Sequence, residues 1–135
     1  MPLVRVELTD AYSQETAISV GNAIHSALVE IFGIPESDKF QILHRNATGS
    51  LVAEDAGLGF QRSLAMVIIQ IFTQRGRSAV MKSALYAEIA NRLGEMGVEG
   101  EDIFIGYHEN GPEDWSFGFG RAQYLTGELS VPKTA

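Results

Sequence analysis

The sequence predicts an α+β fold in which one β-α-β unit occurs twice, giving a four-stranded mixed sheet with two helices on one face. Two observations lead to this prediction: the apolar residues switch between the period of a strand and that of a helix, and the second half repeats landmarks of the first. The length of 135 residues suits one domain with one core. We therefore predict a single domain at 1–135, with repeat units at about 2–45 and 66–109 and a tail at 110–135.

The first unit opens with a strand at residues 4–8, where apolar and polar side chains alternate. Ser13 can cap a helix whose apolar positions recur on one face, and Gly33 stands where a left-handed C-cap belongs. Residues 40–44 predict a second short strand. The connection at 45–63 is long, and connections of that length are commonly functional lids or disordered segments.

The second unit has the same order of elements. Residues 65–72 are almost all apolar and rich in β-branched side chains, as expected of a central strand buried on both faces. A turn at 73–77 follows, and Ser78 can cap a second helix that ends at Gly97. Residues 103–108 predict the fourth strand.

The repeat predicts how the strands are arranged. Four landmarks recur after the same interval of 64 residues, namely Gly33 and Gly97, Asp38 and Asp102, Phe40 and Phe104, and His44 and His108. Strands joined through a helix run parallel, and a two-fold relation between the units makes the first and third strands antiparallel. The start of the first strand and the end of the third then lie at the same edge of the sheet.

The repeat also predicts an asymmetry. At this interval Pro2 corresponds to Met66, which is buried in mid-chain, so only the first unit can offer a free terminal amine. Both helices cover one face of the sheet, and nothing else in the chain covers the other. An uncovered apolar sheet face is normally buried in an oligomer, so we expect self-association.

The composition excludes several classes of function. A formal net charge of -7 opposes binding to nucleic acids and to anionic membranes. The absence of cysteine removes thiolate catalysis and thiolate metal sites, and agrees with a cytosolic protein. His25, His44 and His108 lack the spacing of metal ligands. We expect no metal, no cofactor and no membrane-spanning segment.

The chain starts Met1-Pro2, and removal of Met1 would expose the ring nitrogen of Pro2 as a secondary amine. An internal proline has no N–H and no proton chemistry. The function of Pro2 therefore depends on this processing step. A free amine at Pro2 is a candidate acid or base.

Arg75 and Arg77 stand at the end of the third strand, on either side of Gly76. In an extended backbone they point to the same side, and paired guanidinium groups bind carboxylates. The alternative is that both are solvated surface residues. Asp38, just before the second strand, can orient water or the amine, or it can bond backbone amides in a turn, as Asp102 can at the equivalent place.

The tail does not belong to the repeat. Trp115, Phe117 and Phe119 alternate with small residues, so a strand here would place three aromatic rings on one side as an apolar wall. The alternative is that the tail packs on a neighbouring subunit.

Taken together, these motifs resemble the tautomerase superfamily. The resemblance is carried by Met1–Val4, by Asp38 followed by Phe40–Ile42, by the turn at Thr73–Ser78 and by Trp115–Gly118, within the β-α-β duplication. It covers nearly the whole chain, and the nearest branch is that of the malonate semialdehyde decarboxylases. It implies a homotrimer, a small carboxylate substrate and a pocket near subunit boundaries.

The resemblance also implies roles for particular residues. Pro2 matches the catalytic proline, Asp38 the carboxylate that works with it or with water, and Arg77 with Arg75 the arginines that bind the substrate carboxylate. The apolar wall of the family matches Trp115, Phe117, Tyr124 and Leu129. Related dehalogenases carry a histidine in the first helix, whereas His25 lies off the apolar stripe here, so dehalogenation is not expected.

Three functions are compatible with these residues. The first is decarboxylation of malonate semialdehyde or a similar 3-oxo acid by a protonated Pro2, with hydratase or tautomerase side activity. The second is tautomerisation of 2-oxo or enol acids, which needs neutral Pro2 as the general base. The third is a non-catalytic trimeric binding protein. Arginines and an apolar wall lower the pKa of the amine, whereas carboxylates raise it, so its protonation state distinguishes the first two functions.

Overall fold

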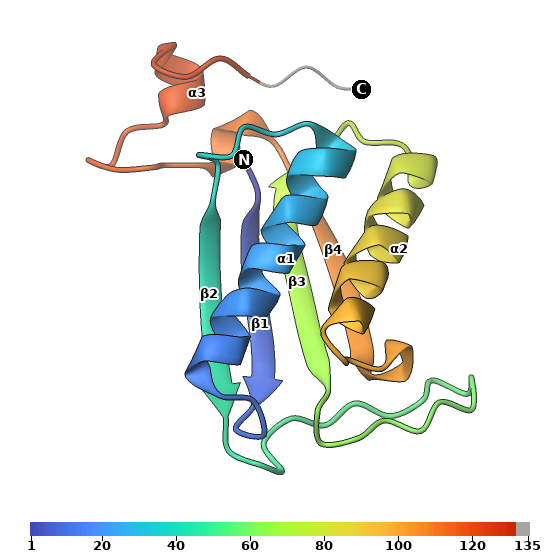
Figure 1. The fold of residues 1–135 in the computed structure, drawn as a ribbon. Coiled ribbons are helices and arrows are strands. Elements are labelled where there is room, and N and C mark those ends of the chain that lie inside the picture. Colours follow the sequence, from blue (N-terminus) through green and yellow to red (C-terminus); the bar gives the residue numbers. More distant parts are fainter. Residues whose placement is uncertain (132–135) are drawn as a thin grey trace.

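The computed structural model describes residues 1–131, so the last four residues of the predicted tail lie outside it. The strands are β1 (Leu3–Thr9), β2 (Phe40–Asn46), β3 (Val67–Gln74) and β4 (Ile103–Asn110), and the main helices are α1 (Gln14–Phe32) and α2 (Ala79–Glu95). Three short helices, η1 (Gly100–Asp102), η2 (Pro112–Asp114) and α3 (Gln123–Thr126), follow α2 in the chain. Both main helices lie on one face of the sheet (Figure 1). The predicted fold class is confirmed.

The sheet has the strand order β2-β1-β3-β4. Strands β1 and β2 are parallel, β3 and β4 are parallel, and the two central strands β1 and β3 are antiparallel, with Leu3 opposite Phe72. The start of β1 and the end of β3 therefore lie at the same end of the sheet (Figure 1). This arrangement brings the amino terminus next to the turn that carries the two arginines.

The strand register corrects the predicted repeat by one residue. Leu3 lies opposite Phe40 in the first unit, whereas Ile68 lies opposite Phe104 in the second, so the first strands of the units are related by 65 positions. The one-residue difference lies between the helix caps, because Gly33 follows Ser13 by 20 positions, whereas Gly97 follows Ser78 by 19. The counterpart of Pro2 is therefore Val67, which is also buried in mid-chain.

The predicted helix ends are observed. The hydroxyl of Ser13 accepts a hydrogen bond from the Thr16 amide at 3.1 Å, which caps α1, and Gly33 ends the helix with φ 68°. The Ser78 hydroxyl accepts from the Met81 amide at 3.2 Å and caps α2. These caps satisfy amides that the first helical turn leaves free. The core lies between the helices and the sheet, with Val4, Val6, Leu8, Ile69, Ile71, Ile24, Leu28, Leu85 and Ile89 fully buried.

The long connection between β2 and β3 is held by hydrogen bonds and lies at the end of the sheet away from the amino terminus (Figure 1). The Asp55 carboxylate accepts from two amides within the loop, and the Ser63 amide and hydroxyl both donate to the Asp102 carboxylate at 2.6 Å. Its position shows that this segment is no lid over the amino terminus.

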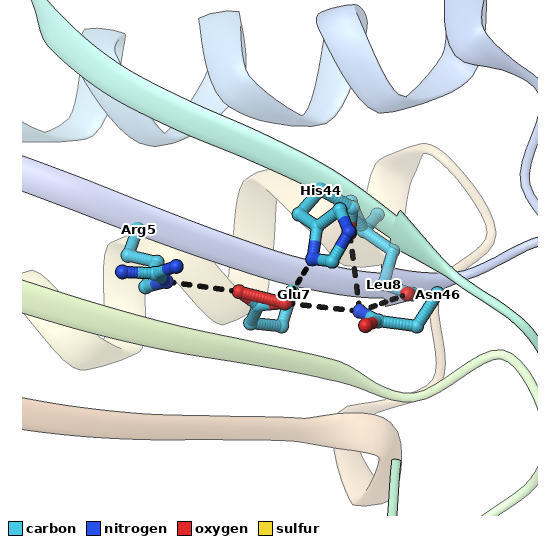
Figure 2. A network of polar contacts seen from close by, with 5 residues as sticks. All are labelled: Arg5, Glu7, Leu8, His44 and Asn46. Carbon is cyan, nitrogen blue, oxygen red and sulfur yellow. Dashed lines mark hydrogen bonds and ion pairs between the residues drawn. The ribbon is translucent and has the colours of Figure 1, made fainter. Parts of the chain in front are cut away.

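The uncovered face of the sheet is more polar than the sequence predicts. The Glu7 side chain on β1 is 16% exposed, and its carboxylate accepts hydrogen bonds from Arg5 Nε and from Asn46 Nδ2, both at 3.0 Å (Figure 2). The same carboxylate pairs with His44 Nδ1 on β2 at 2.9 Å. Burial raises the pKa of Glu7, but these hydrogen bonds outweigh burial and lower it. Apolar side chains, among them Phe40, Ile42, Phe72 and Phe104, share the same face.

The aromatic segment of the tail does not form a strand. The chain reverses at Phe119, which has φ 58°, and Gly118 and Arg121 form a bridge across the turn. Phe119 is 93% exposed, whereas the rings of Trp115 and Phe117 are stacked with centroids 5.8 Å apart. The prediction of three aromatic rings on one side is wrong at Phe119, because a positive φ ends the strand-like alternation there. Within residues 1–131 no helix is long and apolar enough to cross a membrane.

Candidate active site

The amino terminus is enclosed where β1 begins. Pro2 is buried, and the Met1 amine donates a hydrogen bond to the Tyr124 hydroxyl at 3.4 Å. Tyr124 belongs to α3, which the tail carries to the amino-terminal edge of the sheet (Figure 1). The tail therefore encloses the terminus within the same chain.

Charged groups act on this amine from two sides. Burial lowers the pKa of the Met1 amino group below its ordinary value, Asp38 raises it, and Arg77 lowers it further. The net shift is downward because desolvation disfavours the charged form more than Asp38 favours it. An amine at this site is therefore closer to neutral than a solvated one at the same pH.

The two predicted arginines diverge. Gly76 between them has φ 132°, so the backbone is not extended. Arg77 is half-buried; its Nη1 donates to Thr73 Oγ1 at 3.2 Å, and its guanidinium lies 4.8 Å from the centroid of the Phe32 ring. Arg75 is 64% exposed and lies 3.5 Å from the Glu113 carboxylate. Arg77 is thus the arginine that acts on the amine.

Asp38 has no hydrogen-bond partner for its carboxylate among residues 1–131, although it is partly buried. It raises the pKa of the Met1 amine, and it contributes, after burial, to the raised pKa of the Tyr124 phenol. Its carboxylate is therefore available to a ligand. His25, which the sequence places off the apolar stripe, is 9% exposed, and its Nε2 pairs with the Glu36 carbonyl at 2.8 Å.

Aromatic side chains form one wall beside the terminus. Phe117 packs edge to face on Tyr124 with centroids 5.4 Å apart, and Phe40 lies 5.7 Å from Phe117. A cavity of about 370 Å³ opens here, lined by Leu3, Phe40, Asp114, Trp115, Ser116 and Phe117. Leu129 is half-buried, and its amide donates to the Gln123 carbonyl at 3.1 Å, so it belongs to the same folded tail. A larger open hollow of about 490 Å³ on the outer side of α1 contains none of the predicted site residues.

The sequence prediction missed two polar residues at the end of the central strands. Gln74 and Asn110 lie opposite each other where β3 and β4 end, and Gln74 is only 4% exposed. The Trp115 indole donates to Asn110 Oδ1 at 2.8 Å, which orients one aromatic ring of the wall. A buried amide at the end of an otherwise apolar strand was the available signal. Residues 1–131 contain no cluster of three or more acidic or histidine side chains suited to a metal ion.

Two family models match the chain, and both are described as "Tautomerase enzyme"; one covers residues 38–118 and the other residues 2–61. The probable tautomerase YrdN of Bacillus subtilis (strain 168) is 36% identical over 130 residues, which cover 96% of this chain and all of YrdN. The two matched ranges together include both the amino terminus and the aromatic segment.

Solved structures agree with this family. FG41 malonate semialdehyde decarboxylase inhibited by 3-bromopropiolate is 51% identical, with a TM-score of 0.93 over 96% of this chain and 99% of that chain. A second malonate semialdehyde decarboxylase, solved to explain decarboxylase and hydratase activities, is 34% identical, with a TM-score of 0.88 over 94% and 98%. A fused 4-OT symmetric trimer, at 20% identity and TM-score 0.74 over 93% and 98%, shares the fold.

Proposed function

Since the chain belongs to the tautomerase superfamily, we propose that it decarboxylates malonate semialdehyde or a similar 3-oxo acid, using Pro2 as an amino-terminal catalytic group after removal of Met1. The proposal is supported by the enclosed terminal amine between Asp38 and Arg77, beside an apolar wall. This one arrangement combines an acid or base, a cation for a carboxylate and a cavity for a small ligand. The similarity to FG41 malonate semialdehyde decarboxylase supports the choice of substrate.

The proposed reaction depends on how the substrate carboxylate is held. Decarboxylation breaks the bond between the carboxylate carbon and C2, and the electron pair enters the C2–C3 bond while the carbonyl π electrons move to oxygen. Arg77 binds the carboxylate so that the breaking bond aligns with the π system, and Arg75 contributes charge at the rim of the site. Trp115, Phe117, Tyr124 and Leu129 keep water from the carboxylate, which favours its departure as neutral carbon dioxide.

The protonated amine of Pro2 stabilises the developing enolate by donating a proton or a strong hydrogen bond to its oxygen. Carbon C2 then takes up a proton, so malonate semialdehyde and one proton give acetaldehyde and carbon dioxide. Asp38 raises the pKa of the terminal amine and thereby keeps more of it protonated. It also has free lone pairs with which to orient a water molecule, which is the group that hydratase side activity requires.

Tautomerisation of 2-oxo or enol acids is the second candidate, and one observation favours it. The lowered pKa of the terminal amine increases the neutral fraction, and neutral Pro2 is the general base that a tautomerase needs. The relative YrdN is likewise called a probable tautomerase.

The proposal includes a homotrimer in the cytosol, with no nucleic acid or membrane partner. It is supported by the uncovered sheet face, whose exposed Phe40, Ile42 and Phe104 need a cover. The alternative to an enzyme is a trimeric binding protein without catalytic activity, and retention of Met1 in the mature protein would favour it.

The direct test combines product analysis with protein chemistry. The intact mass of the protein made by its own cell reports whether Met1 has been removed. Incubation with malonate semialdehyde, followed by NMR, is expected to show acetaldehyde and release of carbon dioxide. The matched control carries a short uncleaved extension before Met1, which leaves Pro2 as an amide without an acidic proton. Equal turnover by the extended and processed proteins would contradict the proposal.

A further inference from the structure

Arg75 and Glu113 form an ion pair beside the candidate site. The Arg75 guanidinium Nη2 lies 3.5 Å from the Glu113 carboxylate, and the two side chains are 64% and 55% exposed. The Arg75 amide donates to the Asn110 carbonyl at 2.9 Å, which fixes this part of the backbone at the ends of β3 and β4. Exposed ion pairs add little stability and are screened by salt. The pair therefore matters more for the charge that it cancels than for the free energy of unfolding.

The backbone around Glu113 leaves room for this ion pair. A Cβ atom at Gly111 would lie 2.5 Å from a Glu113 carboxylate oxygen and 2.7 Å from Arg75 Nη2. Any other residue at position 111 would therefore have to displace the two charged groups. Pro112 begins the short helix η2, and the Asp114 carboxylate accepts from the Gly111 amide at 2.8 Å, which holds η2 in place.

The ion pair lies next to the cavity in the chain. Asp114, which ends η2, and Trp115, which follows it, both line the cavity of about 370 Å³. The carboxylate of Glu113 is therefore one residue away from the cavity wall. Its partner Arg75 precedes Arg77 by two residues, so the pair brings an acidic and a basic group to the same site.

The pairing leaves the two arginines with different charge balances. The ion pairs within residues 1–131 include Arg75 and do not include Arg77. Arg77 Nη1 donates only to neutral oxygens, those of the Thr73 hydroxyl and the Gln74 carbonyl. Of these two cations, Arg77 is thus the one whose charge no carboxylate pairs with. The site then offers one free positive charge to an anionic ligand.

We propose that Glu113 determines specificity by limiting the site to substrates with a single carboxylate. Its carboxylate cancels the charge of Arg75 and repels a second carboxylate on the ligand. A monoanionic 3-oxo acid such as malonate semialdehyde is accepted, whereas a dianionic one such as 2-oxobutanedioate is disfavoured. This inference rests on the proposed function, because it concerns the selectivity of the same site.

The test uses Trp115, the only tryptophan in the chain, as a fluorescent reporter of binding in the cavity that it lines. The full-length, processed protein is titrated with malonate, a dianion at neutral pH, and with propionate, a monoanion with the same number of carbon atoms. Glu113→Gln keeps the shape of the side chain and removes its charge. We expect its Kd for malonate to fall by about 3- to 10-fold, because Arg75 is freed and the repulsion is removed. Its Kd for propionate should change by less than about twofold.

Two further variants and a change of salt serve as controls. Glu30→Gln removes the same charge from a side chain that is 56% exposed and pairs with Arg92 on α2, so it should leave both Kd values unchanged. In the Arg75→Met background, Glu113→Gln should lose most of its gain in affinity for malonate, because no guanidinium group is freed. At high salt the difference between Glu113→Gln and the wild type should decrease, because exposed charges are screened.

Three results would overturn the inference: an unchanged Kd for malonate in Glu113→Gln, an equal gain for malonate and propionate, or the same gain in Glu30→Gln. A wild type that binds neither acid also overturns it. Because fluorescence measures binding, a wild type that binds these acids without decarboxylating malonate semialdehyde contradicts the proposed function alone. In an active enzyme, Glu113→Gln should raise kcat/KM for 2-oxobutanedioate relative to malonate semialdehyde by about 3- to 10-fold. An unchanged ratio would contradict the role of Glu113.

Discussion

The two copies of the β-α-β unit use equivalent acids in different ways. Asp102 is 2% exposed and holds the loop before β3, accepting from the amide and the hydroxyl of Ser63. Asp38, its counterpart, has no hydrogen-bond partner among residues 1–131 and lies near the terminal amine. The acid before the second strand of each unit therefore has a structural role in the second unit, whereas in the first unit its carboxylate is available to a ligand. The difference between the units, more than the fold they share, indicates where chemistry takes place.

The same contrast applies to the first strands. Pro2 directly precedes β1 near the amino terminus, whereas Val67, its counterpart, is preceded by a loop and is completely buried. Only the first unit can present an amine, whereas the second places a core side chain at the equivalent position. Substitutions at equivalent positions should therefore affect different properties.

The largest expected effect is on the first strand. Pro2→Ala should lower turnover of malonate semialdehyde by about 10²- to 10⁴-fold, because it replaces the secondary amine, and should leave the free energy of unfolding nearly unchanged. Val67→Ala is the comparison; it should lower that free energy by about 1.5–3 kcal/mol through lost burial and a small cavity. Its kcat per folded molecule should stay at the wild-type value. Steady-state kinetics and urea unfolding measure the two effects, and a stability loss in Pro2→Ala equal to that of Val67→Ala would argue against the contrast.

The two acids give the next prediction. Asp38→Asn should lower kcat/KM by about 10²-fold with little change in stability, since the carboxylate has no hydrogen-bond partner among residues 1–131. Asp102→Asn should lower the free energy of unfolding by about 1.5–3 kcal/mol, because it weakens two hydrogen bonds to a buried carboxylate. Both variants are measured at equal protein concentration, because the stability of a protein that self-associates depends on its concentration. If Asp38→Asn destabilises as much as Asp102→Asn, Asp38 is a structural turn residue.

The two arginines of the second unit are also expected to differ in how strongly they bind the substrate carboxylate. Arg77→Met should raise KM for a small 3-oxo acid by about 10- to 100-fold, the effect of losing a charge-assisted hydrogen bond. Arg75→Met should change KM less than about threefold, since its side chain is 64% exposed and pairs with Glu113. Initial rates over a range of substrate concentrations distinguish them. An equal rise in KM for both variants would show that the two guanidinium groups bind the carboxylate together.

Much of the fold follows from local signals in the sequence. The helix caps at Ser13, Gly33 and Ser78 lie where the sequence predicts them, because capping depends on a few adjacent residues. The antiparallel contact between β1 and β3 follows from the two-fold relation of the units. The one-residue offset that pairs Pro2 with Val67 was missed, because the repeat interval was taken from Gly33 and Gly97 after the helices, whereas the strands before the helices follow the longer interval.

The site was harder to predict, because it depends on backbone angles and on the path of the tail. Alternation alone could not show that Phe119 adopts φ 58° and turns away from the wall. Nor could the spacing of Arg75 and Arg77 show the bend at Gly76. In the sequence, Gln74 is one more residue at the end of an apolar strand, and only the structure shows that its side chain is 4% exposed.

The smallest effect expected is a shift in the pH profile, and it separates the two proposed reactions. Burial lowers the pKa of the terminal amine, and we expect the same for Pro2 once Met1 is removed. A decarboxylase that needs the protonated amine is fully active below this pKa and loses activity as the pH rises through it, whereas a tautomerase gains activity over the same range. Asp38→Asn should move the transition to lower pH, because Asp38 raises the pKa of the amine, and Asp102→Asn should leave it in place. The measurement is the pH profile of kcat/KM for the wild type, Asp38→Asn and Asp102→Asn. An equal shift in both variants would mean that the two acids do not differ in their effect on the pKa of the amine.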